Sequence, residues 1–279
     1  MKKYVLKASG EKELFSDNKI YGSLLKAGAS PSLANKTTEE VQTELKGEIG
    51  TDKVYNSILE QLTNTEPQIA IKYSLKRAIM KLGPTGYLFE KYIARILQEY
   101  GYTTEVGQKV NGYCVNHEVD VIALQNNQHF MVECKYHNEP GIRSDIKIVL
   151  YIYARFLDVE RAWKLKEGHE SMFHQAWLVT NTKCTSDAIR YASCMNMRII
   201  SWHYPKEASL EYLIENKELY PITILPSLET VGIEKLSISG ILLAKELLRY
   251  SKDDLGEILS TSSSISQKIF EEVNLLFRK

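Results

Sequence analysis

The chain has 279 residues, of which 44% are hydrophobic, and this composition excludes a disordered chain and allows two or three domains. Its 35 basic and 35 acidic residues give a formal net charge of zero, which argues against a nucleic-acid binder that relies on overall charge, although Glu66 to Arg95 has a local basic excess. No apolar run is long enough to cross a membrane and no signal-like region opens the sequence, so we expect a cytoplasmic protein with no membrane partner.

The N-terminal third contains four landmarks in a fixed order. Tyr4 to Glu11 predicts a short strand and turn, and Phe15 to Ala29 predicts the opening of a helix. The segments Gly50 to Tyr55 and Ile69 to Tyr73 follow. Together they resemble the ATP-cone, a mostly helical nucleotide-sensing module found on ribonucleotide reductases and on some transcriptional repressors. The resemblance predicts a nucleotide-binding domain over residues 1–82.

This resemblance implies a regulatory nucleotide, ATP or dATP. Lys7 and Lys19 would meet its phosphates, and Thr51 would add hydroxyl and amide donors at the positive end of a helix dipole. Ala8 departs from the second basic residue that many ATP-cones carry. No Walker-type loop occurs, which argues against ATP hydrolysis. Two alternatives remain: the lysines are ordinary surface charges, or the module is an oligomerisation domain that has lost its ligand.

Residues 83–86 form a turn-rich segment between two predicted domains, and we expect it to be a short hinge that couples them. An amphipathic helix follows from Gly86 to Leu97 and ends before Gly101.

Two apolar strands on either side of a polar turn carry the most informative residues. A turn centred on Asn126 and Asn127 matches Leu124 with His129, and counting outward places Asp120 opposite Glu133. Lys135 points to the same face, because side chains alternate along a strand. Two facing carboxylates repel unless a cation lies between them, and hard oxygen ligands suit Mg²⁺ or Mn²⁺.

This arrangement resembles the PD-(D/E)xK core of Mrr-like restriction endonucleases. Family members carry a glutamate on the first helix, and Glu90 matches it. Downstream, Gln175 to Asn181 predicts a buried strand, followed by a helix over 185–195 and a strand from Arg198 to Trp202. The resemblance implies an α/β domain over residues 87–205, in the order α-β-β-β-α-β, with a mixed sheet flanked by helices.

The resemblance also implies metal-assisted hydrolysis of phosphodiester bonds. The ion would be held by Asp120, Glu133 and the Cys134 carbonyl, and Glu90 would complete the shell or position a second ion or a water. Lys135 would orient the attacking water and balance transition-state charge. The alternative for these residues is a solvated, carboxylate-rich strand face. His117 faces away from Asp120 and is interpreted as a packing or DNA contact.

The next helix departs from the family. Many Mrr-like enzymes have a glutamine there, and none occurs between Gln128 and Gln175. Instead Lys147, Tyr151 and Arg155 follow one another at intervals of four residues, and such a stripe could hold the DNA backbone. The alternative is a solvent-facing helix edge.

Four cysteines without CxxC spacing predict reduced, packed thiols, and the lone pair Cys114 and His117 does not make a zinc half-site. Residues 206–279 predict helices. Within them, Ile233 to Leu236 and Ile241 to Leu248 resemble a degenerate helix-hairpin-helix that binds DNA backbone, with a helical bundle for dimer contacts as the alternative.

Two classes of function follow. The first is an ATP-regulated, metal-dependent DNA endonuclease of the Mrr-like restriction or defence type, forming a dimer or tetramer so that two sites can cut both strands. The second is a non-catalytic, nucleotide-sensing DNA-binding regulator that uses the nuclease fold as a platform. Four charged residues at one site favour the enzyme, because a platform has no need to keep them.

Overall fold

A computed structural model describes residues 3–7, 10–44, 47–165 and 173–278. By internal contacts the chain divides into two compact units. Unit 1 combines Met1–Lys81 with Tyr220–Lys279, and unit 2 is Leu82–Leu219. This differs from the three consecutive domains expected from the sequence, because the last sixty residues complete the N-terminal unit. Among the described helices, none has the length and apolarity needed to span a membrane.

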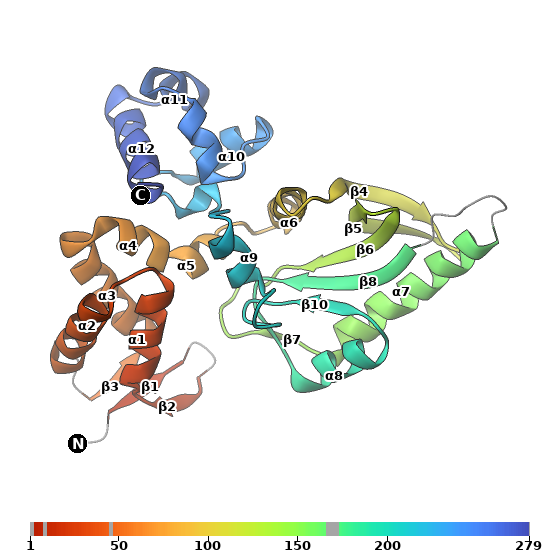
Figure 1. The fold of residues 1–279 in the computed structure, drawn as a ribbon, viewed down its shortest axis with the longest axis horizontal. Helices are drawn as coiled ribbons and strands as arrows, with labels where there is room; N and C mark the ends of the chain where they lie inside the picture. Colours follow the sequence, from red (N-terminus) through yellow and green to blue (C-terminus); the bar gives the residue numbers. More distant parts are fainter. Residues whose placement is uncertain (1–2, 8–9, 45–46, 166–172, 279) are drawn as a thin grey trace. The chain divides into compact units, whose positions relative to one another are not determined.

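Unit 1 begins with a small sheet of three strands and a set of helices (Figure 1). The strands are β1 (Tyr4–Leu6), β2 (Lys12–Leu14) and β3 (Glu48–Gly50). The central β1 pairs antiparallel with β2 and parallel with β3. The helices are α1 (Asp17–Lys26), α2 (Pro31–Glu44), α3 (Thr51–Thr65), α4 (Pro67–Tyr73) and α5 (Leu75–Ile79). Their apolar faces share one core, which includes the fully buried Leu24, Val41 and Leu62.

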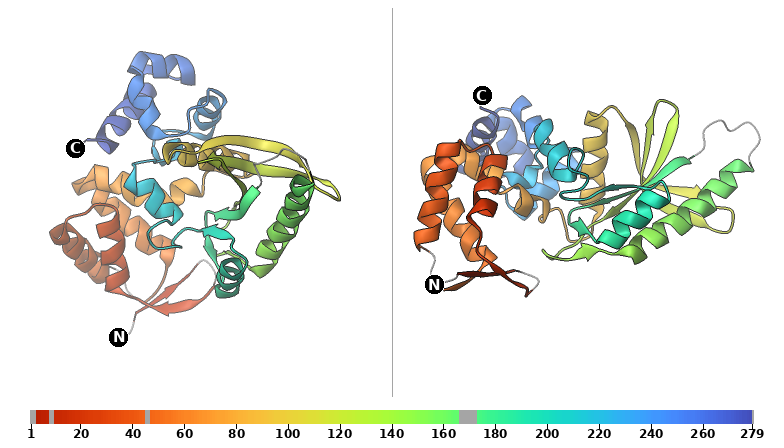
Figure 2. Two further views of the ribbon diagram at one scale, coloured as in Figure 1. Left: turned by 45° about the vertical axis from the view of Figure 1, so that its right-hand side comes forward. Right: turned by 60° about the horizontal axis from the view of Figure 1, so that its bottom comes forward.

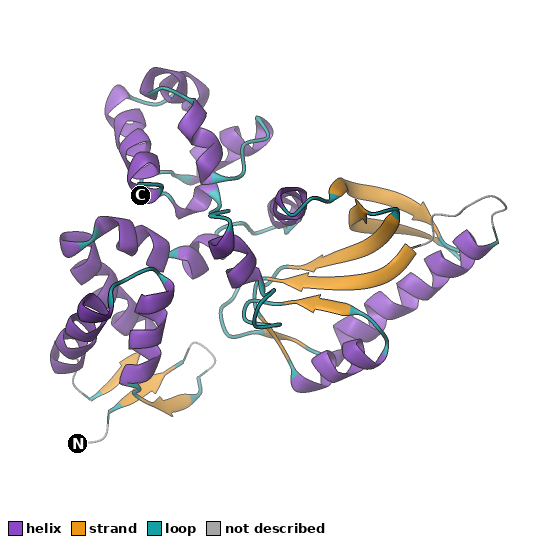
Figure 3. Ribbon diagram, viewed as in Figure 1, coloured by secondary structure: helices purple, strands orange, loops and turns teal. Residues whose placement is uncertain are grey.

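The C-terminal part of unit 1 is almost entirely helical (Figure 3). It contains the 3₁₀ helices η1 (Ile222–Ile224) and η2 (Ala244–Arg249) and the α-helices α10 (Thr230–Ile238), α11 (Lys252–Leu259) and α12 (Ser263–Leu276). Its contacts with the N-terminal helices include a hydrogen bond from Thr223 to the Ala78 carbonyl and one from Gln68 to the Arg278 carbonyl, each at 2.7 Å. These contacts place residues 220–279 with the N-terminal third.

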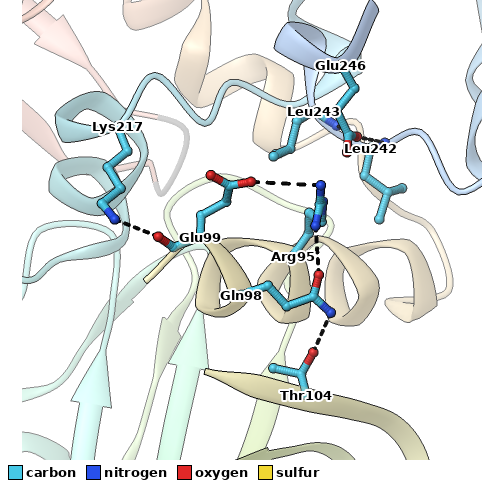
Figure 4. Close-up of polar contacts among 8 residues, drawn as sticks. All are labelled: Arg95, Gln98, Glu99, Thr104, Lys217, Leu242, Leu243 and Glu246. Carbon is cyan, nitrogen blue, oxygen red and sulfur yellow. Dashed lines mark hydrogen bonds and ion pairs between the residues drawn. The ribbon is translucent and has the colours of Figure 1, made fainter. Parts of the chain in front are cut away.

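The helix-hairpin-helix expected in this region differs from the observed structure. The first expected helix, Ile233 to Leu236, lies in α10. The second, Ile241 to Leu248, is not an α-helix: Leu243 forms an isolated β-bridge with Pro221, and the 3₁₀ helix η2 follows. Glu246 accepts hydrogen bonds from the amides of Leu242 and Leu243, each at 3.0 Å, and so caps η2 (Figure 4). At the glycine turn itself, the amides of Gly240 and Ile241 donate to the carbonyls of Ser237 and Leu236. These main-chain donors are already satisfied within the chain, so the turn does not offer them to a DNA backbone.

Unit 2 has the element order predicted from the sequence. Helix α6 (Tyr87–Glu99) precedes β4 (Thr103–Asn111), β5 (Asn116–Gln125) and β6 (Gln128–Lys135). After the short β7 (Arg143–Ser144) come α7 (Ile146–Lys164), β8 (Phe173–Thr180), β9 (Lys183–Cys184), α8 (Ser186–Cys194), β10 (Arg198–Ile200) and α9 (Leu210–Asn216). The mixed α/β fold expected from the sequence is confirmed.

The main sheet of unit 2 has the strand order β10-β8-β6-β5-β4. Strands β4, β5 and β6 are antiparallel neighbours, whereas β8 and β10 run parallel to β6. Helices α7 and α8 pack on one face through a core that includes Ile152, Phe156 and Ala188, and α6 lies on the other side of the sheet (Figures 1 and 2). The central β6 therefore has helices on both sides, which explains its apolar sequence.

Residues 206–219 belong to this unit because α9 and the turn after it are tied to α6. The hydroxyl of Tyr92 donates to the Leu219 carbonyl at 2.7 Å, and that of Tyr100 donates to the Leu213 carbonyl at 3.0 Å. The ammonium of Lys217 donates to the Glu99 carbonyl at the end of α6 (Figure 4).

The expected hinge over residues 83–86 is packed against the nuclease unit. The Tyr136 hydroxyl is hydrogen-bonded to the main chain of Gly83, and Asn138 donates to the Pro84 carbonyl at 3.4 Å. A Cβ atom on Gly83 would lie 2.7 Å from atoms of both Tyr136 and Asn138, so only glycine fits there. This segment is a docked connection within unit 2.

Candidate active site in the α/β unit

A two-residue turn fixes the register of the central hairpin. Asn126 and Asn127 have φ values of 52° and 60°, the left-handed conformation that both central residues of a type I′ turn require. The predicted pairing of Leu124 with His129 is confirmed, and the paired ladder runs to Val121 and Val132.

Asp120 and Glu133 are the next residues on β5 and β6, at the point where the paired ladder ends. The Asp120 carboxylate accepts a hydrogen bond of 2.7 Å from the Cys134 amide, so a side chain binds this amide of β6 just beyond the ladder. Burial raises the pKa of Asp120. The Asp120 carboxylate is therefore held where β5 and β6 stop pairing with each other.

Glu133 is 7% exposed and has two different oxygen environments. Arg155 of α7 forms an ion pair with Oε2. The other oxygen, Oε1, is buried and has no hydrogen-bond partner among the described residues. Burial, followed by the nearby Asp120 carboxylate, raises the pKa of Glu133 to about 8, although Arg155 opposes this shift. A buried carboxylate oxygen without a partner fits a site that a cation completes.

Glu90 lies in the first turn of α6, near enough to Asp120 and Glu133 for its carboxylate to interact with theirs. Burial, then the carboxylates of Asp120 and Glu118, raise its pKa to about 7. The structure thus brings together the carboxylates of Glu90, Asp120 and Glu133, and their mutual repulsion would be relieved by a divalent ion. Within the described ranges, however, no three His, Cys, Asp or Glu side chains are already grouped closely enough to act as metal ligands.

Lys135 ends β6, two residues after Glu133. Its side chain is exposed, and its ammonium makes no hydrogen bond or ion pair with any part of the chain that the structure describes. The cation is therefore available to a ligand that enters the site.

Comparison with known proteins agrees with the fold of this unit. Residues 84–206 match the Mrr catalytic-domain family, described as a restriction endonuclease. The chain contains an Mrr-type restriction endonuclease domain. A domain of this type is a nuclease, which is a hydrolase with DNA as its partner.

Similarity to another protein extends over a longer stretch of the chain. An uncharacterized protein from Archaeoglobus fulgidus is 36% identical over 179 residues, which cover 64% of this chain and 97% of the relative, and the chain belongs to the same family. A crystal structure of a protein of unknown function is 34% identical, with a TM-score of 0.57, and the match covers 67% of this chain and 96% of that one.

The predicted DNA-contacting stripe of the Mrr-type domain is divided in the structure. Lys147 and Tyr151 are exposed on α7, and Tyr151 keeps 62% of its surface. The Arg155 side chain is only 12% exposed and turns toward Glu133. Eight residues at 3.6 per turn advance about 80° beyond two full turns, which moves Arg155 from the solvent edge toward the sheet. Sequence reasoning overlooked this rotation and so missed the ion pair.

His117 and Cys114 both bind Asp158 of α7. The carboxylate accepts from the Cys114 amide and lies beside His117 Nε2, each at 2.8 Å. The His117 hydrogen bond, ahead of the Cys114 and Val115 contacts, lowers the pKa of Asp158 to about 2. In its expected packing role, His117 therefore contacts Asp158 of α7.

In unit 1, the predicted nucleotide-binding residues Lys7, Lys19 and Thr51 line one cavity of about 290 Å³. Lys7 lies 2.8 Å from the Glu13 carboxylate, which Lys19 also contacts, and these hydrogen bonds lower the pKa of Glu13 to about 2. Sequence reasoning missed Glu13. The remaining wall is largely apolar and includes Tyr55, whose ring stacks on Tyr73 at 5.4 Å.

Proposed function

We propose that the Mrr-type domain is a Mg²⁺- or Mn²⁺-dependent DNA endonuclease of the restriction type, and that unit 1 regulates it by binding ATP or dATP. The observation that carries the metal dependence is the buried, unpartnered Oε1 of Glu133 beside Asp120. Hard carboxylate oxygens in such a place suit Mg²⁺ and Mn²⁺.

The roles follow from position. Asp120, Glu133 and the Cys134 carbonyl would hold the ion, and Glu90 would complete its shell or hold a water. When bound, the ion supplies Lewis-acid activation of water and neutralises charge on the phosphate. Lys135 would hold the attacking water and balance the developing charge, since it is exposed and lies two residues after Glu133 on β6. Lys147 and Tyr151 would contact the DNA backbone.

The cavity of unit 1 supports the regulatory part of the proposal. Lys7 and Lys19 would bind phosphates after these displace Glu13, and Thr51 would add donors at the N-terminus of α3. The neighbouring tyrosine pair offers a surface for the base. A dimer or tetramer would place two nuclease sites on one duplex.

One observation favours the second candidate, a non-catalytic DNA-binding regulator. The ion pair with Arg155 already engages one oxygen of Glu133, so the site carries its own internal cation. In that case the four charged residues would stabilise the fold and the domain would bind DNA without cutting it.

Cleavage of supercoiled plasmid with Mg²⁺ or Mn²⁺ separates the two candidates. We expect wild type to nick the plasmid and Asp120→Ala or Lys135→Ala to lose at least about 100-fold in rate. Lys183→Ala, a change at an exposed lysine of the same unit, is the control and should cut normally. Absence of cutting by wild type on methylated and unmethylated plasmid would favour the regulator.

The same plasmid assay also tests the proposed regulation by ATP or dATP. We expect ATP or dATP to change the nicking rate of wild type, and Lys19→Ala to remove that effect while metal-dependent nicking persists. An ATP effect that survives both Lys7→Ala and Lys19→Ala would place the nucleotide elsewhere.

A further inference from the structure

Arg155 reaches two strands of the sheet at once. Its Nη1 donates to Glu133 Oε2 on β6, and its Nη2 donates to the main-chain carbonyl of Glu118 on β5. Glu118 lies two residues before Asp120. One side chain from α7 therefore joins the two strands that carry the candidate metal ligands.

These contacts lie where β5 and β6 no longer pair with each other, although β5 still pairs with β4 and β6 with β8. The β5–β6 pairs end at Val121 and Val132. Beyond these pairs, the described residues link the two strands in two ways. The Cys134 amide donates a hydrogen bond to Asp120, and Arg155 donates one hydrogen bond to each strand. Hydrogen bonds of the Asp120 and Arg155 side chains therefore add direct links between the two strands at the position of Asp120 and Glu133.

The guanidinium also distinguishes the two oxygens of Glu133. It engages Oε2 and leaves Oε1 buried, with no partner among the described residues. A guanidinium is planar and presents its donors in a rigid fork, so its grip on Oε2 and on the Glu118 carbonyl restricts rotation of the carboxylate. The orientation of Oε1, the other oxygen of Glu133, is thereby fixed as well.

We propose that Arg155 is a positioning residue that orients Glu133 for a divalent ion, and not the DNA contact that its place on the helix suggested. This inference rests on the proposed function, because it takes Glu133 to be a metal ligand. Residues that hydrogen-bond to a metal ligand typically change metal affinity or activity by roughly 10- to 100-fold when replaced.

The direction in which metal affinity changes when Arg155 is replaced distinguishes a positioning role from a purely electrostatic one. A fixed cation beside a divalent ion repels it, so loss of charge alone would tighten metal binding. Loss of the two guanidinium hydrogen bonds would instead weaken metal binding. Arg155→Lys keeps the charge and removes the fork, whereas Arg155→Gln removes both.

The test is Mn²⁺ binding by the full-length protein, measured by electron paramagnetic resonance at one pH. We expect Arg155→Lys to bind Mn²⁺ about 10-fold or more weakly than wild type. Lys164→Gln, at an exposed lysine in the last turn of the same helix, is the matched control and should bind Mn²⁺ as wild type does. Thermal melting identifies any variant that fails to fold, and Arg155→Lys carries the test if Arg155→Gln unfolds.

Plasmid nicking gives the second readout. For Arg155→Lys we expect kcat to fall about 10-fold or more at saturating Mn²⁺ while KM for DNA stays within about twofold, since the residue does not touch DNA. A change in KM with kcat and Mn²⁺ affinity unchanged would overturn the proposal in favour of a DNA contact. Unchanged or tighter Mn²⁺ binding by Arg155→Lys would also overturn it.

Failure of the proposed function looks different. If wild type binds Mn²⁺ but does not cut DNA, the nuclease proposal fails, and a loss of Mn²⁺ affinity in Arg155→Lys still supports the positioning role. If wild type cuts DNA and the variant keeps its Mn²⁺ affinity, only the positioning role fails.

Discussion

At the scale of single residues, the raised pKa of Glu90 has a consequence for stability. The folded protein holds the Glu90 pKa at about 7 through burial and neighbouring carboxylates, against an ordinary value of 4.5. Between these two values the folded state binds a proton that the unfolded state releases, so stability falls as pH rises through this range. Above pH 7 the cost of the buried charge is fully present.

We therefore predict that Glu90→Gln melts at a higher temperature than wild type at pH 8 in EDTA, by about 1–3 °C. At pH 4.5 the difference should be small, because the wild-type carboxyl is protonated when folded. Thermal melting at the two pH values checks this. Equal melting temperatures at pH 8 would show that Glu90 is not strained by its neighbours.

The juxtaposition of Asp120 and Glu133 was predictable at this scale, whereas the contact of Arg155 with Glu133 was not. Asn126 and Asn127 define a short turn, so pairing could be counted along two strands to Asp120 and Glu133, and the register agrees. Arg155 depends on the angle at which a helix crosses the sheet, which local periodicity does not contain. Glu13 was missed for a similar reason, since its strand has only three residues.

At the scale of elements, Asp158 joins α7 to the tip of the β4–β5 hairpin. It accepts from two consecutive amides, of Cys114 at 2.8 Å and Val115 at 3.3 Å, and binds His117. We predict that Asp158→Ala lowers the melting temperature by about 5 °C at pH 7, because these amides lose their acceptor. Asp187→Ala, at an exposed surface pair with Arg190, is the control.

The pH dependence of this effect has a defined sign. The folded pKa of Asp158 is lowered from 3.8 to about 2, so its contribution is complete above pH 3.8 and is lost as pH falls toward 2. The gap between wild type and Asp158→Ala should therefore persist from pH 5 to 8. A gap that closes within this range would contradict the assigned contacts.

The docked connection before α6 gives a second prediction for elements. Gly83→Ala would place a Cβ 2.7 Å from Tyr136 and Asn138, and overpacking of this kind costs about 1–3 kcal/mol. Gly22→Ala, in α1, meets no atom within 4 Å and should stabilise by about 0.5–1 kcal/mol. Urea denaturation of both variants compares them, and an unchanged midpoint for Gly83→Ala would mean that the connection is loose.

At the scale of the whole molecule, the sequence predicted the parts better than their grouping. The order of elements in the nuclease unit followed from hydrophobic periodicity and turn residues. The joining of residues 220–279 to the N-terminal unit depends on contacts such as Gln68 with Arg278, separated by 210 positions, which no local pattern reveals.

This grouping predicts how fragments behave. A fragment of residues 82–219 should unfold cooperatively, because its core is internal. A fragment of residues 1–81 should be less stable alone than when residues 220–279 are added. Circular dichroism melting of each fragment and of the mixture checks this. Identical melting of residues 1–81 with and without the added segment would contradict it.

The discontinuity of unit 1 also sets an order for biosynthesis. Residues 1–81 are translated before unit 2, yet the helices that complete their unit are translated after it, whereas all residues of unit 2 are contiguous. The nuclease fold should therefore form before unit 1 is complete. A chain arrested after residue 219 would carry a complete unit 2 and an incomplete unit 1, so the two units reach their final structures at different times.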